Sequence, residues 1–281
     1  MPTDWSSSNM MMRCLCLLIF SFQVLALPGI ASLNQCPDVI FNDAFENNSS
    51  PSLGTGGGFP GDQNIAINIP KIGIRTYYLY VPDGYQASEA WPLLVLWHGQ
   101  VVPGQADTEA QNIRNFWQQT AEANNIIILA QASSGAGGGW LPGTDSQILA
   151  AMIDDVQSLY NIENNRIYGW GFSAGAHVMH AIALNNTDFF AGYAASAGTL
   201  SNFAGTAVLE AAPRKIAAFV SVGTQDPLFS DAQAESLLFQ QAGWVLGRNY
   251  WLDAFNGGHQ LNNDLPEKAW QAICTATLLD E

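Results

Sequence analysis

Basic residues are scarce in this chain. Only nine of its 281 residues are Lys or Arg, against 24 Asp or Glu, and the formal net charge is −15. A protein that binds nucleic acid needs a positively charged surface to meet the phosphates, so this composition argues against a nucleic-acid partner. The excess of acid suits a soluble secreted protein and carries no information about the fold.

Long apolar runs are lacking beyond the N-terminal region. The run Cys14–Leu27 follows a lone basic residue, Arg13, and leads into the small-residue stretch 28–31. It is too short for a membrane span and ends as secretory signal peptides end. We therefore expect residues 1–31 to be a signal peptide, with a buried N-terminal helix as the alternative. The mature protein is then secreted, extracellular or periplasmic, and not held in a membrane.

Cysteine is rare as well, with four residues in the chain. Cys14 and Cys16 would leave with the signal peptide, so the mature chain keeps Cys36 and Cys274. In an oxidising compartment a single pair of cysteines suggests one disulfide. We expect a Cys36–Cys274 bond that ties the N-terminal arm to the last helix, and two unpaired cysteines are the alternative.

The mature chain of about 250 residues is long enough for one large domain with a full core. Residues 32–64 are rich in Asn, Ser, Gly and Pro, which is typical of an arm or linker. Residues 65–281 are expected to form a single catalytic domain.

Strands and helices are expected to alternate in this domain. Apolar strands are predicted at 74–81, 92–97, 126–130, 166–170, 192–197, 216–222 and 249–254, and helices at 108–124, 145–160, 174–184, 232–242 and 266–278. Continuous apolar strands between helices favour the α/β class, with a mostly parallel central sheet and helices on both of its faces.

The most informative stretch is Gly171-Phe172-Ser173-Ala174-Gly175, which follows an apolar strand and opens a helix of small residues. Gly-x-Ser-x-Gly in this setting is the nucleophile elbow of the α/β-hydrolase fold. The serine sits on a tight turn, and the two glycines let the strand and the helix approach each other. We therefore predict the α/β-hydrolase fold, with Ser173 as the nucleophile.

A serine hydroxyl needs a base to remove its proton and an acid to orient that base. His259, in a glycine-rich loop after the last predicted strand, is the expected base. Asp226 follows the strand 216–222 and is the expected acid, with Asp231 as the alternative. His177 and His180 are spaced as two metal ligands but lack a third at a matching distance, so we predict no metal and no cofactor.

The turn His98-Gly99 ends an early central strand, where such enzymes take a second donor for the oxyanion. The predicted oxyanion donors are the backbone N–H groups of Ala174 and of Gly99 or Gln100. Trp97 and Trp140 are expected near the cleft. They are candidates for binding the substrate by stacking on an aromatic acyl group or a sugar, and the alternative is that they fill the core.

Several segments together resemble a known group. They are Asn-Ile-Glu-Asn-Asn-Arg-Ile-Tyr at 161–168 followed by Gly-Phe-Ser-Ala-Gly-Ala, the preceding helix at 150–156, and a Tyr-rich strand that ends in Val-Pro-Asp-Gly-Tyr. Residues 74–276 are similar to secreted polyhydroxybutyrate depolymerase-like esterases, which are related to the feruloyl and acetylxylan esterases of carbohydrate esterase family 1. The resemblance implies a triad of Ser173, Asp226 and His259.

The leading hypothesis is a secreted serine esterase that works through an acyl-enzyme. Its substrates would be carboxylic esters, such as polyhydroxyalkanoate oligomers or feruloyl or acetyl esters, including esters on polysaccharides. A catalytically silent binding protein with this fold is one alternative. A serine peptidase of the prolyl-oligopeptidase type is another, although the chain leaves no room for the propeller domain of those enzymes.

Overall fold

The computed structural model describes residues 51–55, 58–200 and 206–278. The predicted signal peptide and Cys36 lie outside these residues. The strands are β1 (Gly61–Ile69), β2 (Gly73–Val81), β3 (Trp91–Trp97), β4 (Ile127–Gln131), β5 (Ile162–Phe172), β6 (Gly192–Ser196), β7 (Ala217–Gly223) and β8 (Tyr250–Phe255). The helices are α1 (Ala106–Asn124), α2 (Pro142–Leu159), α3 (Ala174–Asn185), α4 (Ala207–Ala211), α5 (Phe229–Gln241) and α6 (Leu265–Ile273).

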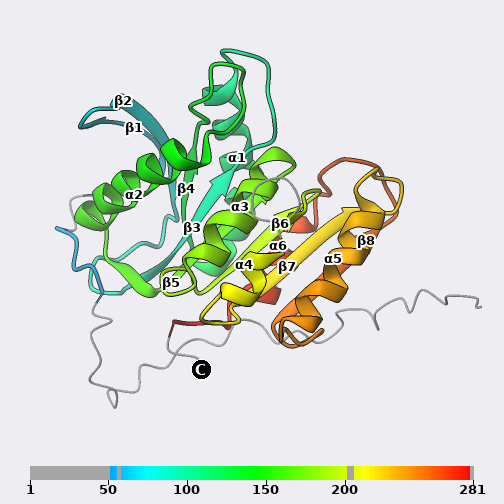
Figure 1. Ribbon diagram of the computed structural model, residues 1–281. Coiled ribbons are helices and arrows are strands. Elements are labelled where there is room, and N and C mark those ends of the chain that lie inside the picture. The colour runs from blue at the N-terminus through cyan, green and yellow to red at the C-terminus, as the bar shows by residue number, and fades with distance from the viewer. Residues whose placement is uncertain (1–50, 56–57, 201–205, 279–281) are drawn as a thin grey trace, which may run out of the picture. The chain divides into compact units, whose positions relative to one another are not determined.

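The strands form one sheet of eight in the order β1-β2-β4-β3-β5-β6-β7-β8 (Figure 1). β1 pairs antiparallel with β2, and β2 pairs antiparallel with β4. All the other neighbours in the sheet are parallel. The predicted mostly parallel sheet is confirmed.

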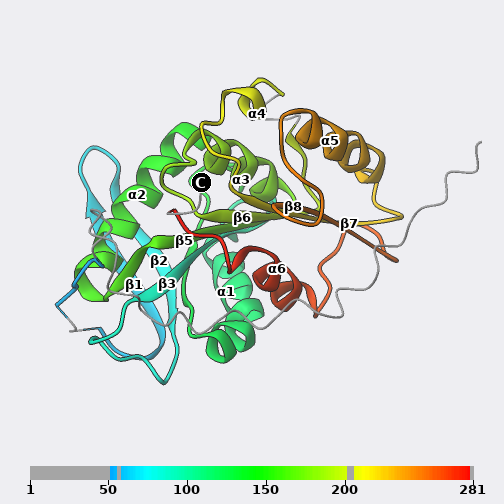
Figure 2. The same cartoon turned by 90° about the horizontal axis from the view of Figure 1, so that it is seen from below.

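Helices cover both faces of the sheet. α1 and α6 lie on one face, and α2, α3 and α5 lie on the other (Figure 2). Along β3, Leu94 and Leu96 pack with α1 and α6, whereas Leu93 and Val95 pack in the core on the opposite face. A strand buried on both faces must be apolar at every position, which explains the continuous apolar runs of the sequence.

Two elements were not predicted from the sequence. These elements are α4 and β1. Because β1 begins at Gly61, the predicted boundary between the N-terminal arm and the catalytic domain, between residues 64 and 65, falls within this strand. β1 lies at the edge of the sheet and alternates half-buried and exposed side chains, so it lacks the apolar run that marks the central strands. Upstream of β1, the N–H of Ser52 also donates to Ile162 O at 2.9 Å.

The central strands end along a common rim. Trp97 of β3 pairs with Gly171 of β5, Ser196 of β6 pairs with Ser221 of β7, and Gly223 of β7 pairs with Phe255 of β8. The segments that follow these strands therefore leave the sheet at the same edge. The carboxyl edge of a parallel sheet is where α/β proteins build their sites.

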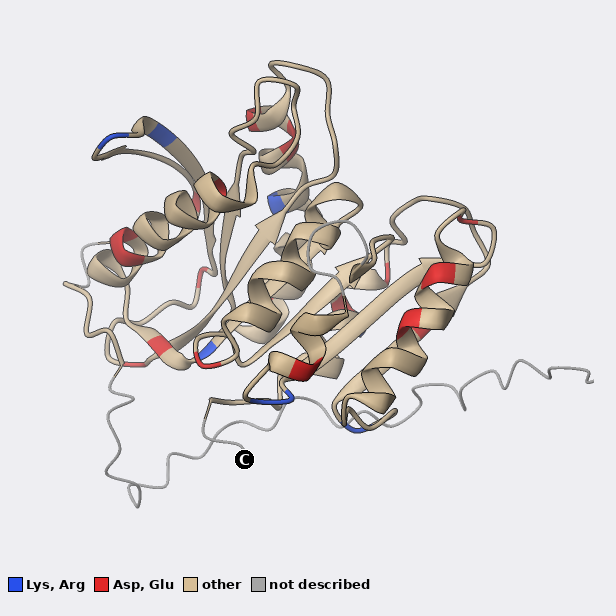
Figure 3. Ribbon diagram, viewed as in Figure 1, with Lys and Arg blue, Asp and Glu red and all other residues tan. Residues whose placement is uncertain are grey.

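Acidic residues are spread over the outer helices, including α2, α4 and α5 (Figure 3). Ion pairs join Arg114 to Asp62 at 3.0 Å and Lys268 to Asp264 at 2.9 Å. Among the helices that the structure describes, none has the length and apolar character needed to cross a membrane.

Candidate active site

Ser173 alone separates β5 from α3, and its backbone carries the strain of the turn. Its φ of 52° and ψ of −117° lie in a region that residues other than glycine rarely adopt. Three hydrogen bonds hold it there: the Ser173 N–H donates to Ser196 O at 2.8 Å, and Ser173 O accepts from the Ala176 N–H at 3.0 Å and from the His177 N–H at 3.1 Å. The turn presents the serine side chain at the rim of the sheet.

The two glycines of the motif are required by backbone contacts. A Cβ atom placed on Gly171 would lie 2.4 Å from Gly175 O. A Cβ atom on Gly175 would lie 2.3 Å from Trp97 O and 2.5 Å from His98 O. Any side chain at either position would therefore push α3 away from β5 or β3.

The structure brings Ser173, His259 and Asp226 together. His259 Nε2 lies 2.8 Å from Ser173 Oγ, and His259 Nδ1 lies 2.8 Å from Asp226 Oδ2. An ionised Asp226 only accepts, so Nδ1 carries the proton and Nε2 turns its lone pair to the serine hydroxyl. This arrangement can take the hydroxyl proton as the oxygen attacks a carbonyl carbon.

The carboxylate is buried and fixed from a second side. Asp226 is 4% exposed, and its other oxygen accepts the Leu228 N–H at 2.9 Å. Asp231, the alternative acid, lies in the first turn of α5, where a carboxylate stabilises the helix dipole. The partner of His259 Nδ1 is Asp226.

The loop that carries the acid is joined to the loop that carries the histidine. The Thr224 N–H donates to Phe255 O and the Gln225 N–H donates to Gly257 O, both at 2.8 Å. A Cβ atom on Gly223 would lie 2.3 Å from Gly257 O, so the two loops touch through bare backbone. This contact fixes the position of the Asp226 carboxylate relative to the His259 imidazole.

The predicted oxyanion donors lie next to the serine. A Cβ atom placed on Gly99 would be 3.4 Å from Ser173 Cβ, and Ala174 is the first residue of α3. Among the described residues, the N–H groups of Gly99, Gln100 and Ala174 donate to no protein acceptor. Free donors beside a nucleophile can bind the oxygen of a tetrahedral intermediate.

Comparisons with known proteins point to esterases, although no protein-family model matches the chain. The chain is 28% identical over 170 residues to a bifunctional acetylxylan esterase/xylanase of Neocallimastix patriciarum, a match that covers 58% of this chain and 23% of that protein. It is 27% identical over 126 residues to a probable feruloyl esterase C of Aspergillus oryzae, which covers 44% of this chain and 46% of that protein. The match thus spans less than half the length of either relative.

Among solved structures, a CE1 ferulic acid esterase of Anaeromyces mucronatus, determined in complex with ferulic acid, superposes with a TM-score of 0.61. The sequence identity is 14%, and the superposition covers 80% of this chain and 94% of that one. The chain has the α/β-hydrolase fold. This fold places its nucleophile between a strand and a helix and its acid and histidine after later strands, in the chain order serine, acid, histidine. Ser173, Asp226 and His259 occupy those places here.

Within the α/β-hydrolase fold of this chain, Trp97 and Trp140 stack on each other with ring centroids 4.3 Å apart. Trp97 has no exposed surface and Trp140 is 7% exposed. The Trp140 Nε1–H donates to His98 O at 2.8 Å. Stacking on a substrate requires an exposed ring face, so the structure favours the alternative that these rings fill the core.

The two histidines on α3 are buried packing residues. His177 Nδ1 lies within hydrogen-bond distance of the Thr199 backbone, and His180 Nδ1 is 2.9 Å from Tyr193 Oη. Burial lowers the pKa of His180 to about 3, so its imidazole is neutral. The described part of the chain contains no cluster of three His, Cys, Asp or Glu side chains able to hold a metal ion.

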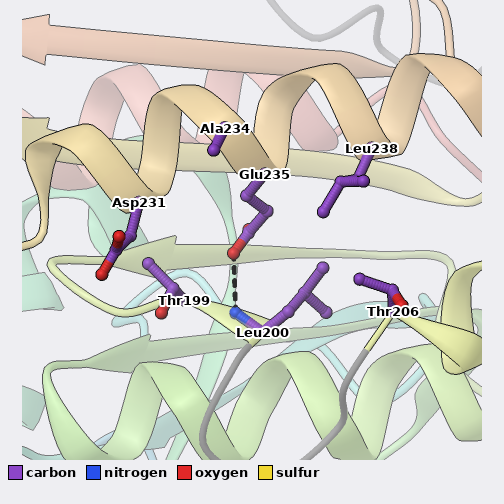
Figure 4. A pocket seen from close by; sticks show the side chains of 7 residues that line it. All are labelled: Thr199, Leu200, Thr206, Asp231, Ala234, Glu235 and Leu238. Atoms are coloured by element: carbon purple, nitrogen blue, oxygen red, sulfur yellow. Dashed lines mark hydrogen bonds between the residues drawn. The ribbon is translucent and has the colours of Figure 1, made fainter.

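A small, largely apolar pocket lies between α5 and the segment that follows β6 (Figure 4). The side chain of Glu235 reaches from α5 across this space and accepts the Leu200 N–H at 2.6 Å. The contact ties the segment after β6 to the helix above it.

Sequence reasoning missed the support that residues 133–140 give to the segment 98–101, which contains the predicted oxyanion donors Gly99 and Gln100. The Gln100 side chain donates from Nε2 to Gly137 O at 2.8 Å, and the Val101 N–H donates to Gly138 O at 3.1 Å. A Cβ atom on Gly139 would lie 2.4 Å from Gln100 Oε1. The run of three glycines was the available signal, because such runs mark close approach of two backbones.

Proposed function

We propose that the chain is a secreted serine esterase that hydrolyses carboxylic esters through a Ser173–His259–Asp226 triad. The observation that carries the proposal is the chain of two 2.8 Å contacts from Ser173 Oγ through the imidazole to Asp226. The acetylxylan and feruloyl esterases among its relatives support feruloyl and acetyl esters as substrates, and polyhydroxyalkanoate oligomers remain part of the proposal.

In the first half of the reaction, Ser173 Oγ attacks the ester carbonyl carbon while His259 Nε2 takes the hydroxyl proton. The carbonyl oxygen becomes an oxyanion that accepts hydrogen bonds from the N–H of Ala174 and from the Gly99–Gln100 segment. The bond to the alcohol oxygen then breaks, and His259 gives its proton to the departing alcohol. Ser173 is left as an acyl-enzyme.

In the second half, water attacks the acyl carbon and His259 Nε2 takes its proton. The same donors hold the second oxyanion. The bond from the acyl carbon to Ser173 Oγ breaks, the proton returns to the serine, and the carboxylic acid leaves. Asp226 keeps the imidazole in the required tautomer throughout.

Replacing the nucleophile tests the proposal. We expect Ser173→Ala to lower kcat/KM for p-nitrophenyl acetate and methyl ferulate by at least about 10⁴-fold, because no other described group takes the place of the alkoxide. A fluorophosphonate probe should label the wild type and not the variant. Thermal melts of the two proteins should coincide to within a few degrees.

Other outcomes separate the alternatives. Equal ester hydrolysis by the two folded proteins would contradict the proposal. A wild type that neither hydrolyses esters nor reacts with the probe would favour a silent binding protein. Preference for peptide amides over esters would favour a peptidase.

A further inference from the structure

The side chain of His98 holds the peptide that follows it. His98 has no exposed surface, and its Nδ1 lies 2.6 Å from Gly99 O while its Nε2 accepts the Ser133 N–H at 3.1 Å. An amide N–H can only donate, so Nε2 carries the lone pair and the proton is on Nδ1. His98 therefore donates from Nδ1 to Gly99 O. Burial lowers the pKa of His98, which keeps this neutral form in place.

The acceptor of this bond belongs to the same peptide unit as a candidate oxyanion donor. Gly99 C=O and Gln100 N–H share one planar trans amide and point in opposite directions. Fixing the oxygen fixes the direction of the N–H. The peptide runs beside Ser173, since a Cβ atom placed on Gly99 would lie 3.4 Å from Ser173 Cβ.

We propose that His98 is a positioning residue that aims the Gln100 N–H at the oxyanion. The inference rests on the proposed esterase function. It assigns the second oxyanion donor to Gln100 and not to Gly99, a choice that the sequence left open. The bond from Nδ1 also polarises the amide, which makes the Gln100 N–H a stronger donor.

The surrounding contacts make the arrangement rigid. The Trp140 indole donates to His98 O at 2.8 Å, and its ring centroid lies 4.7 Å from that of His98. The Gln100 side chain and the Val101 N–H both donate to the glycine run at 137–138. Donors that are fixed before the reaction need no reorganisation when the oxyanion forms, which is the basis of their effect on rate.

Three substitutions at His98 separate the two ring nitrogens. In His98→Asn, the amide nitrogen stands near the position of Nδ1 and can still donate to Gly99 O. In His98→Gln, the amide reaches toward Ser133 instead, and His98→Leu has no polar atom. We expect the Leu variant to lose about 10²–10³-fold in kcat and equally in kcat/KM on p-nitrophenyl acetate, with KM within a fewfold of wild type. The Asn variant should be at least tenfold more active than the Gln variant.

The affinity of a tetrahedral mimic is a measurement that loss of packing alone would not change. Phenylboronic acid forms an adduct on the serine whose oxygen occupies the oxyanion position, so its affinity should fall in proportion to kcat/KM across the His98 variants. Binding of the planar product ferulate should change less than threefold. His180→Leu, which removes another fully buried histidine, is the matched control and should keep kcat of the folded enzyme within about twofold.

The outcomes are distinct. An active wild type with a folded Leu variant of equal kcat/KM would overturn the assignment while leaving the esterase function in place. Asn and Gln variants of equal activity would overturn it as well, even where the Leu variant does not fold. A wild type that hydrolyses no ester and resists fluorophosphonate would remove the proposed function and this assignment together.

Discussion

At the scale of single residues, the site depends on Ser173, whose φ and ψ lie in a region that is unfavourable for a residue with a side chain. A residue with a side chain at such a φ and ψ costs about 1–3 kcal/mol, and the surrounding structure must enforce it. Here β5, α3 and the bond to Ser196 O enforce it, and bare glycines on both sides allow the close approach. Ser173 is thereby fixed in place by the fold itself.

Gly175→Ala should damage the site through packing alone. The new methyl group would meet the carbonyl oxygens of Trp97 and His98, so α3 must move away from the end of β3. We expect a loss of about 1–3 kcal/mol in the free energy of unfolding and a fall in kcat of at least tenfold. Urea unfolding and steady-state kinetics measure the two effects.

Gly143→Ala is the matched control for this substitution. Gly143 lies in the first turn of α2 with nothing within 4 Å of a new Cβ atom, so the alanine should leave stability unchanged or raise it by about 0.5–1 kcal/mol. A Gly175→Ala variant with wild-type stability and activity would show that the elbow tolerates a wider gap between strand and helix.

The elbow could be predicted from sequence because its physics is local. Gly171 is needed for a contact with Gly175 that the motif itself creates, so the spacing of the two glycines indicates the turn, although Gly175 also meets the end of β3. The sequence did not indicate the place of Trp97, because a large aromatic ring suits the core and a substrate cleft equally. The role we propose for His98 depends on Ser133 and Trp140, which no pattern in the sequence links to it.

At the scale of elements, α5 carries an acid into the core. Glu235 is 3% exposed, and burial raises its pKa to about 8. Its second oxygen lies 3.5 Å from His180 Nε2 on α3. The charge of Asp231 on α5 also raises the pKa of Glu235. Burial, and then the charge of Glu235, raise the pKa of Tyr193 on β6 and of Tyr250 on β8.

These shifts set the sign of a pH dependence. Between about pH 4.3 and 8, native Glu235 keeps a proton that the unfolded chain has lost, so its contribution to stability falls as pH rises. Native His180 stays neutral between about pH 3 and 6.5 while the unfolded chain binds a proton, so its contribution rises with pH. The two oppose each other at acid pH, and above about pH 6.5 the effect of Glu235 dominates.

We therefore expect the wild-type Tm to fall between pH 6.5 and 8.5, and Glu235→Gln to flatten that slope. The glutamine has the same shape, can accept the Leu200 N–H and carries no charge at any pH. Thermal melts across this range measure the difference, with the exposed Glu210→Gln on α4 as the control. Parallel slopes for wild type and Glu235→Gln would contradict the expectation.

The central strands and the longer helices could be predicted because burial on two faces leaves a strong pattern. The run before His98 and the helix after Ser173 both matched within a residue or two. β1 could not be predicted in this way, because it is an edge strand that is held by pairing with β2 and alternates half-buried with exposed side chains. Short α4 owes its place to tertiary contacts, which the sequence does not display.

At the scale of the whole molecule, the end of the domain carries a disulfide. Cys274, at the C-terminus of α6, is disulfide-bonded in the structure. Its predicted partner, Cys36, lies outside the described residues, so the pairing stays a prediction. A bond between these positions would close a loop that includes the whole sheet.

Removing the bond should lower stability without reaching the active site. We expect Cys274→Ala to lose about 2–5 kcal/mol in the free energy of unfolding, and Cys36→Ala to lose a similar amount. Reductant should lower the Tm of the wild type and leave both variants unchanged. If Cys36→Ala still formed a disulfide, as a thiol count on the unfolded protein would show, the predicted pairing would be wrong.

The order of strands in the sheet has a consequence for how activity is lost. β8 is the outermost parallel strand, with β7 as its only neighbour in the described sheet, and the loop that begins where it ends delivers His259. Fraying of that border would remove the imidazole while β3, β5 and β6 stay paired. Mild heat or denaturant would then abolish the proposed esterase activity while most of the secondary structure persists, so inactivation would be an early sign of melting and not its endpoint.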